Sequence, residues 1–216
     1  MSKIKTLESL TGLGIVAVVR GNSINQAEKT VEAVIKGGIK AIELTFTVPQ
    51  ADKLVAKEVD KYKENSSILI GAGTVLDPVS ARIAILAGAK FIVSPSLNKD
   101  VLKLCNLYAI PYIAGAQSLS EIQAAQEEGI DIIKLFPGNV ATPKMVKEVI
   151  GGPLPQVNLM PTGGVSLNNM ADWFSAGVVA IGTGGSLTAP AKNENYKAVT
   201  QNAHDFVNKF KEIKNK

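Results

Sequence analysis

The sequence is poor in the residues on which disulfide-stabilised, zinc-dependent and nucleic-acid-binding proteins depend. It contains one cysteine, Cys105, one histidine, His204, and two arginines, Arg20 and Arg82. A lone cysteine cannot form an internal disulfide, and a lone histidine cannot supply the histidine cluster of a zinc enzyme. Scattered lysines without clustered arginines and interleaved aromatic residues argue against a nucleic-acid partner. We therefore expect no metal site, with magnesium held by carboxylates as the alternative that composition leaves open.

The sequence also lacks a long apolar run. No segment approaches the length of a membrane span, so we expect no membrane partner. Residues 10–19, LTGLGIVAVV, resemble the apolar region of a signal peptide, but Arg20 stands where a small-residue cleavage site would follow. We interpret residues 10–19 as the first strand. Cys105 has the setting of a buried helix face, and the chain suits the reducing cytoplasm.

What the sequence does contain is a regular alternation of short apolar runs and longer amphipathic stretches. The chain has 216 residues, of which 46% are hydrophobic and 19% charged, and its net charge is +4. This pattern is typical of βαβ units on a parallel sheet that is buried on both faces. The predicted strands are residues 14–20, 39–46, 68–74, 90–95, 110–115, 130–136, 157–164 and 178–185.

Helix start and stop signals separate these strands. Ser23, Asp77, Ser118 and Thr142 stand where helix N-caps are expected, and Asp77 and Thr142 are each followed by proline. Four helices are predicted to end at glycine just before a strand, in KGGIKAIEL, LAGAKFIVS, EEGIDIIKL and SAGVVAIGT. Eight such units without a linker favour one domain over residues 1–216, an α/β fold that closes as a single-domain (β/α)8 TIM barrel rather than an open sheet.

Side-chain alternation predicts which residues point into such a barrel. In AIELTF the apolar residues occupy alternate outward positions, which leaves Glu43 inside, and in IIKLF the same alternation leaves Lys134 inside. Active sites of these barrels lie at the carboxyl ends of the strands. The polar residues predicted to point inward at or near those ends are Arg20, Glu43, Thr45, Thr74, Lys134 and Thr162.

An inward lysine and glutamate have two interpretations. They could form a buried ion pair that only fills the barrel interior. Because burying two charges is costly and often brings little net stability, a role in chemistry is the favoured interpretation. Burial and a neighbouring Arg20 both disfavour the protonated amine, so Lys134 is expected to attack a carbonyl carbon, with Glu43 as the proton carrier.

Glycine and hydroxyl residues end the last two strands, in PTGGVSLNN and GTGGSL. Backbone N–H groups of glycine turns at helix N-termini bind phosphate, and barrels commonly bind phosphate after strands seven and eight. Ordinary turn glycines are the alternative explanation. Two such turns at the expected places predict a phosphate site.

The motifs IVAVVR, AIELTFTVP, IGAGTV, FIVSPSL, IKLFPG and MPTGGV, taken in order, resemble the 2-keto-3-deoxy-6-phosphogluconate (KDPG) and 4-hydroxy-2-oxoglutarate (KHG) aldolase family. The likeness extends over nearly the whole chain and ends before its C-terminal residues. It implies a class I pyruvate aldolase on a small (β/α)8 barrel that needs no cofactor and is usually a homotrimer. For the phosphogluconate substrate it also implies a place in the Entner–Doudoroff pathway.

The resemblance further implies a role for each matching residue. Lys134 is similar to the family's Schiff-base lysine and Glu43 to its general acid/base. The residues expected to surround the pyruvate half are Arg20, Thr74, Pro95 and Phe136. Those expected to bind the phosphate are Thr162, Gly163, Gly164, Gly184, Gly185 and Ser186.

Two positions depart from the family pattern. Many members have an arginine shortly after the glutamate, where this chain has Thr47, so binding of the substrate carboxylate is expected to rest on Arg20 and backbone amides. The last glycine motif also places Ser186 directly beside Leu187, whereas the family usually has a residue between them.

The expected reaction is cleavage of a 2-keto-3-deoxy-6-phospho sugar acid to pyruvate and glyceraldehyde 3-phosphate, and of KHG to pyruvate and glyoxylate. Which sugar acid is preferred stays open. Another phosphate-binding barrel enzyme, such as an isomerase, epimerase or decarboxylase, would keep the glycine turns without a covalent lysine. A non-catalytic metabolite-binding barrel would need neither Lys134 nor Glu43.

Overall fold

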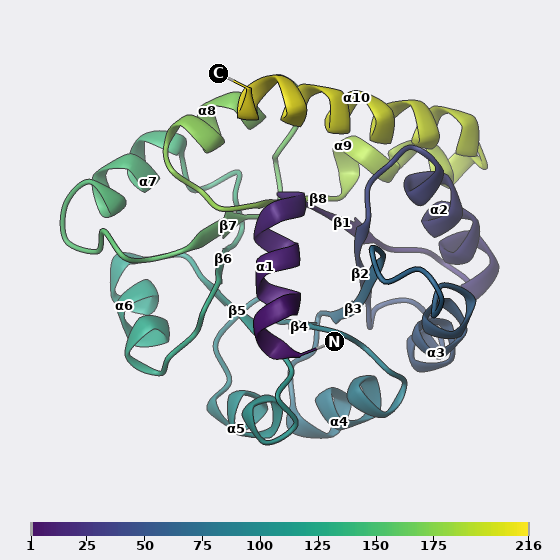
Figure 1. Cartoon of the computed structure of the whole chain (residues 1–216), viewed down its shortest axis with the longest axis horizontal. Helices are drawn as coiled ribbons and strands as arrows, with labels where there is room; N and C mark the ends of the chain where they lie inside the picture. The colour runs from purple at the N-terminus through teal and green to yellow at the C-terminus, as the bar shows by residue number, and fades with distance from the viewer. Residues whose placement is uncertain (1, 216) are drawn as a thin grey trace.

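The computed structural model describes residues 2–215 and shows eight parallel strands that alternate with helices around a ring (Figure 1). The strands pair in the order β7-β6-β5-β4-β3-β2-β1-β8, and a bridge between Thr162 and Gly182 joins the two ends of this order. The predicted (β/α)8 barrel is therefore confirmed. The strands are β1 Ile15–Val19, β2 Ala41–Thr45, β3 Leu69–Gly73, β4 Ile92–Val93, β5 Tyr112–Ala116, β6 Ile133–Leu135, β7 Leu159–Pro161 and β8 Ile181–Thr183.

Helices surround the ring of strands, and α10 packs beside α2 on the outside (Figure 1). The helices are α1 Lys3–Leu13, α2 Ile24–Lys36, α3 Ala51–Lys61, α4 Pro78–Leu86, α5 Lys99–Leu107, α6 Leu119–Glu127, α7 Pro143–Ile150, α8 Met170–Ser175, α9 Gly185–Thr188 and α10 Tyr196–Lys214, with the 3-10 helix η1 Ala189–Asn193 between α9 and α10.

The structure contains the helix caps that the sequence predicts at both ends of the helices. The side chains of Ser23, Asp77, Ser118 and Thr142 each accept a hydrogen bond from the backbone N–H three residues later, which satisfies one orphan donor of the helix. The four glycines that follow helices have φ between 79° and 101°, a left-handed conformation that other residues adopt only with strain. These glycines are Gly38, Gly88, Gly129 and Gly177.

The interpretation of residues 10–19 as a strand is wrong in its first part. Residues 10–13 belong to α1, and β1 begins only at Ile15. Gly14 ends the helix with φ 66°, and its N–H donates to the carbonyl of Leu10. α1 lies across the middle of the ring (Figure 1), and Leu10 packs among the side chains that fill the barrel. The helix therefore closes the barrel at the amino-terminal ends of the strands.

Several strands are shorter than their predicted ranges. β7 covers Leu159–Pro161 of the predicted 157–164, and β8 covers Ile181–Thr183 of the predicted 178–185. The extra residues at the carboxyl ends include Gly163 and Gly164, whose positive φ turns the chain out of the ladder. These residues form loops at the barrel mouth instead.

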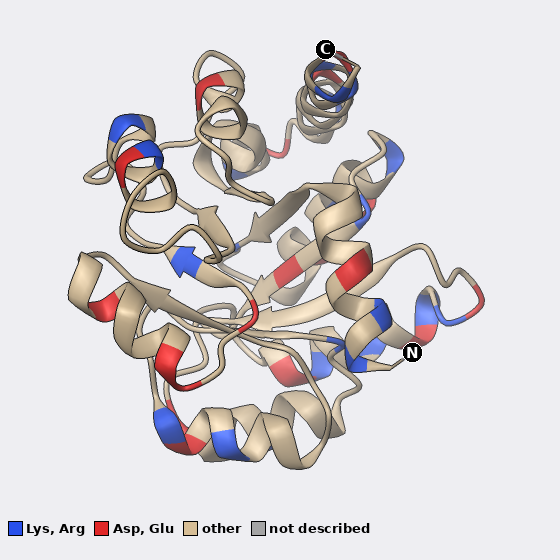
Figure 2. Cartoon of the chain, turned by 60° about the vertical axis from the view of Figure 1, so that its left-hand side comes forward, with Lys and Arg blue, Asp and Glu red and all other residues tan. Residues whose placement is uncertain are grey.

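Alternation along the strands separates two apolar regions. The inner cluster contains Val16, Ala41, Leu69, Ile113 and Ile132, and the larger outer core lies between strands and helices. Charged residues gather on the helices and loops, whereas the strands are almost free of them (Figure 2). Within the eight strands described, Glu43 and Lys134 are the only charged residues.

Cys105 is buried on α5, as predicted, and burial raises the pKa of its thiol to about 12. Such a thiol is a poor nucleophile at neutral pH.

Among residues 2–215, none of the helices combines the length and the apolar character required to cross a bilayer.

Candidate active site

The site is built around the two charged strand residues. Lys134 lies in the middle of β6 and Glu43 in the middle of β2, and the lysine Nζ donates to the glutamate Oε1 over 3.4 Å. The Lys134 side chain is 6% exposed and the Glu43 side chain is fully buried. The structure therefore brings together, inside the barrel, two residues that are 91 positions apart in the chain.

The neighbouring strand β3 makes room for Glu43. A Cβ atom at Gly73 would lie 2.1 Å from Glu43 Oε1, so a side chain at this position would displace the carboxylate. The next residue, Thr74, has φ 57°, which is a strained conformation for a β-branched residue and is typical of functional sites. Within the described residues, the second oxygen of Glu43, Oε2, is buried without a hydrogen-bond partner. It is free to accept a proton or a hydrogen bond from a ligand.

A pocket of about 970 Å³ opens at the carboxyl ends of the strands, which we call the mouth pocket. Arg20, Phe136 and all six residues predicted to bind phosphate line it. They come from the ends of β1, β6, β7 and β8, which are neighbours in the closed ring. The Lys134 Nζ lies 5.1 Å from the centre of the Phe136 ring, so the catalytic candidates meet the pocket at this residue.

Besides Lys134 and Glu43, two predicted substrate-binding residues do not line the mouth pocket: Thr74 and Pro95. Thr74 follows Gly73, the residue against Glu43. The carbonyl of Pro95 lies so close to Gly115 that a Cβ there would be 2.0 Å away, and Gly115 pairs with Lys134 in the register of β5 and β6. Both residues thus lie near the Glu43–Lys134 pair rather than in the pocket itself.

Sequence reasoning missed part of the lining. The missed polar residues are Asn22, Gln26, Asn139, Thr188 and Lys192. Asn22 and Gln26 follow Arg20 closely, and the asparagine N–H donates to the Gln26 side chain over 2.8 Å. Their place in the loop after β1 and in the first turn of α2, which begins at the barrel mouth, was the signal that could have identified them. Thr47, at the position of the family's arginine, also lines the pocket, and its hydroxyl lies 2.7 Å from that of Thr45.

The hydroxyl groups after β8 are already engaged within the chain. The Ser186 hydroxyl donates to the carbonyl of Val165, and the Thr188 hydroxyl donates to the carbonyl of Gly184 over 3.0 Å. Ser186 is therefore in the pocket as predicted, but its proton is not available to a ligand in this arrangement.

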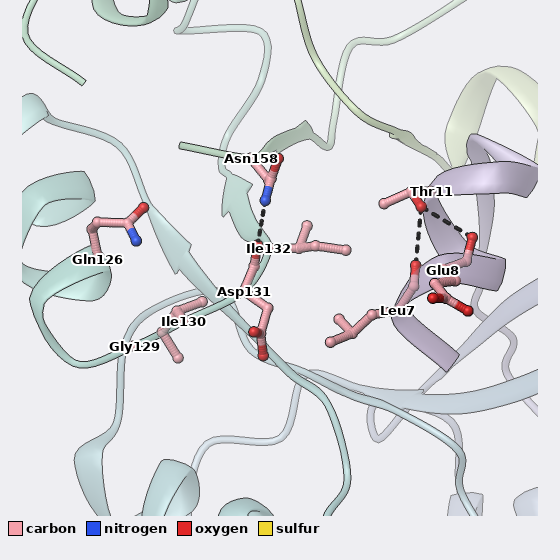
Figure 3. Close-up of a pocket in the computed structure, with 9 residues that line it drawn as sticks. All are labelled: Leu7, Glu8, Thr11, Gln126, Gly129, Ile130, Asp131, Ile132 and Asn158. Carbon is pink, nitrogen blue, oxygen red and sulfur yellow. Dashed lines mark hydrogen bonds between the residues drawn. The ribbon is translucent and has the colours of Figure 1, made fainter. Parts of the chain in front are cut away.

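A second pocket, of about 480 Å³, lies at the opposite end of the barrel between α1 and β6 (Figure 3). Glu8 and Asp131 line it without a basic residue, and the Thr11 hydroxyl donates to backbone carbonyls of its own helix. The Lys3 ammonium pairs with Asp131 over 3.0 Å, so Glu8 is the one acidic side chain of this pocket without an ion-pair partner in the described chain. The mouth pocket, which has basic residues in its lining, is the one that favours an anionic ligand. Among residues 2–215, no three His, Cys, Asp or Glu side chains are grouped as in a metal site.

Comparison with known proteins decides the family. A family model described as KDPG and KHG aldolase matches residues 7–202. The chain belongs to the KDPG and KHG aldolase family. A 2-dehydro-3-deoxy-phosphogluconate aldolase of Treponema pallidum is 35% identical over 191 residues, which cover 88% of this chain and 89% of the relative.

Two solved structures share the fold of this chain, and one of them is a KDPG aldolase. A KDPG aldolase from Legionella pneumophila, with pyruvate captured as a covalent carbinolamine intermediate, has a TM-score of 0.82 and 28% identity, and the match covers 92% of this chain and 96% of that one. A cube-shaped protein cage, designed by fusing symmetric oligomeric domains, has a TM-score of 0.85 and 28% identity over 94% of this chain and 73% of its own. The chain is thus a class I aldolase, a lyase.

Proposed function

We propose that this aldolase cleaves 2-keto-3-deoxy-6-phospho sugar acids to pyruvate and glyceraldehyde 3-phosphate, and 4-hydroxy-2-oxoglutarate to pyruvate and glyoxylate. The observation that carries the proposal is the Lys134–Glu43 pair. Within residues 2–215 these are the only charged residues of the eight strands, they contact each other, and the pocket beside them has basic and no acidic lining. The name of the family and the covalent carbinolamine intermediate that the Legionella relative forms with pyruvate support it.

The first half of the reaction forms the imine. Lys134 passes its ammonium proton to Glu43, and the neutral amine then attacks the C2 ketone of the substrate. Glu43 delivers the same proton to the hydroxyl that leaves as water. The product is a protonated imine. It withdraws electrons from the neighbouring carbon–carbon bond and so prepares the substrate for cleavage.

The second half breaks the bond. The Glu43 carboxylate takes the proton of the C4 hydroxyl, the C3–C4 bond breaks, and its electron pair moves to the imine as an enamine. Glyceraldehyde 3-phosphate or glyoxylate leaves. Glu43 then protonates C3 of the enamine, and water hydrolyses the resulting imine to pyruvate and restores Lys134. Each proton transfer passes through the carboxylate whose Oε2 is left without a partner.

The remaining predicted residues position the substrate in this proposal. Arg20, Thr74, Pro95 and Phe136 surround the pyruvate half. Because Thr47 replaces an arginine of the family pattern, Arg20 and backbone amides bind the carboxylate. The turns after β7 and β8, formed by Thr162, Gly163, Gly164, Gly184, Gly185 and Ser186, bind the phosphate of the leaving half through backbone N–H groups. Thr162 is the exception, because its N–H already donates to the carbonyl of Leu135 over 3.0 Å, and it contributes its hydroxyl, which has no partner within the described chain.

Borohydride reduction in the presence of pyruvate, followed by mass mapping of peptides, tests the covalent step. Pyruvate fixed to Lys134 is the expected result, and Lys134→Ala and a sample without pyruvate are the controls. No adduct on a folded protein would return Lys134 to the role of a buried ion-pair partner. It would favour an isomerase, epimerase or decarboxylase without a covalent lysine.

We also propose a cytoplasmic homotrimer. The helices α4 and α5 expose a group of large apolar side chains, which we call the α4–α5 patch: Val79, Ile83, Leu86, Leu107 and Tyr108. The only charged residue of α4, Arg82, lies over the Tyr108 ring at 4.2 Å and so is engaged within the chain. An exposed group of large apolar side chains is typical of contacts between copies in permanent homo-oligomers. The symmetric oligomeric domains of the similar cage protein are consistent with assembly.

A further inference from the structure

The basic lining of the mouth pocket is shared by two residues that lie in different parts of the chain. Arg20 follows β1, whereas Lys192 lies in η1, after the glycine turn that follows β8. Neither side chain forms an ion pair with another residue of the described chain. Both positive charges are therefore free to bind an anion.

The segment 184–192 offers few side-chain donors to a ligand. It contains three polar side chains, those of Ser186, Thr188 and Lys192, and all three residues line the pocket. The two hydroxyl groups already donate to backbone carbonyls. The Lys192 ammonium is thus the side-chain donor of this segment with protons left to give.

The backbone that carries Lys192 is held in place from three sides. The Gln26 side chain of α2 donates to the carbonyl of Ala191 over 3.0 Å, and the N–H of Asn195 donates to the carbonyl of Pro190 over 3.1 Å. The Asn202 side chain of α10 donates to the carbonyl of Leu187 over 3.1 Å. Only the side chain of Lys192 has to order when a ligand binds, which limits the entropic cost.

The substrate of the proposed reaction has two anionic ends, a carboxylate beside C2 and a phosphate on C6. Arg20 is needed at the carboxylate, because Thr47 supplies no charge. The phosphate end then depends on backbone N–H groups and on the second cation of the pocket. A charged donor to phosphate forms a stronger bond than a neutral one.

We infer that Lys192 binds the substrate phosphate and makes the enzyme prefer 6-phosphorylated over unphosphorylated 2-keto-3-deoxy sugar acids. This inference rests on the proposed function, which names the substrate class but not the preference within it. It gives the residue a role in specificity through binding, apart from the chemistry at Lys134.

The test compares turnover of 2-keto-3-deoxy-6-phosphogluconate with that of unphosphorylated 2-keto-3-deoxygluconate. In Lys192→Gln, the ratio of the two kcat/KM values is expected to fall by about tenfold or more, the range of a charged hydrogen bond, through a higher KM for the phosphorylated substrate. Lys192→Arg is expected to keep most of the preference. Lys197→Gln, which removes an exposed lysine outside the pocket lining, is the matched control and is expected to keep all of it.

A ratio unchanged in Lys192→Gln, or an equal loss on both substrates, would overturn the inference. A calorimetric titration with inorganic phosphate separates it from the proposed function. If the wild-type protein cleaves neither substrate, the proposed function fails. The titration still shows whether Lys192 binds phosphate. Weaker phosphate binding by Lys192→Gln than by Lys197→Gln supports the role of Lys192, and equal binding refutes it.

Discussion

Glu58 is a buried carboxyl group that the proposed chemistry does not use. It lies on α3 with an exposed fraction of zero, and within the described chain neither of its oxygens has a hydrogen-bond partner. Burial raises its pKa from 4.5 to about 7; Lys61 opposes this shift, and Glu28 and Glu32 on α2 add to it. Lys57 also lowers it, as the smallest of these effects.

The sign of the pH dependence follows from which state holds the proton. Below about pH 4.5 the carboxyl is protonated in both folded and unfolded chains. Between 4.5 and about 7 the folded chain keeps a proton that the unfolded chain has lost, so the free energy of unfolding falls as the pH rises. Above about pH 7 the carboxyl is charged in both states, and the folded chain bears the full free-energy cost of burying this charge. One pKa unit corresponds to about 1.4 kcal/mol, so the cost of the charged Glu58 is of order 3 kcal/mol.

Glu58→Gln tests this reasoning, because glutamine has nearly the shape of the protonated acid and cannot ionise. At about pH 5 the variant is expected to match the wild type in its free energy of unfolding, and at about pH 8.5 to exceed it by up to about 3 kcal/mol. Urea titrations followed by the fluorescence of the buried Trp173 measure the difference, at one fixed protein concentration.

Comparison of the two proteins at each pH cancels the titration of all other groups. Glu64→Gln, at an exposed position near the end of the same helix, is the control and is expected to show no pH-dependent difference. A Glu58→Gln difference that is the same at both pH values would refute a buried carboxyl that ionises near neutrality.

Four further predictions concern the site and the assembly. Lys134→Ala is expected to lose at least about 10³-fold in kcat and all trapping of pyruvate, with circular dichroism showing whether the fold persists. Glu43→Gln is expected to slow cleavage by about 10²–10⁴-fold, and activity close to that of the wild type would exclude it as the proton carrier. Gly73→Ala is expected to lower kcat, because its Cβ would lie 2.1 Å from Glu43 Oε1, whereas Gly12→Ala, with nothing within 4 Å of the added Cβ, is expected to leave kcat unchanged. Leu86→Glu, in the α4–α5 patch, is expected to lower the molar mass by light scattering; a variant that keeps the wild-type mass would show that Leu86 lies outside the subunit contact.

Local signals explain why much of the fold could be predicted. The glycines after α2, α4, α6 and α8 adopt positive φ because a helix must turn into the next strand there, and this requirement is visible in short sequence windows. Alternation within β2 and β6 likewise separates Glu43 and Lys134 from the outward apolar residues, because successive side chains of a strand point to opposite faces. The helix α1 was missed because its role depends on the barrel that it closes, in which Leu10 packs against distant strands.

The sequence by itself determined the (β/α)8 architecture, the inward direction of Glu43 and Lys134, and the glycine turns at the ends of β7 and β8, because each depends on local periodicity or backbone conformation. Only the tertiary structure decided that the two charges lie 3.4 Å apart, that Lys192 joins Arg20 around one pocket, and that Glu58 is buried without a partner. These features arise from closure of the ring and from the packing of α2 against α3. They bring together residues whose separation along the chain carries no local signal.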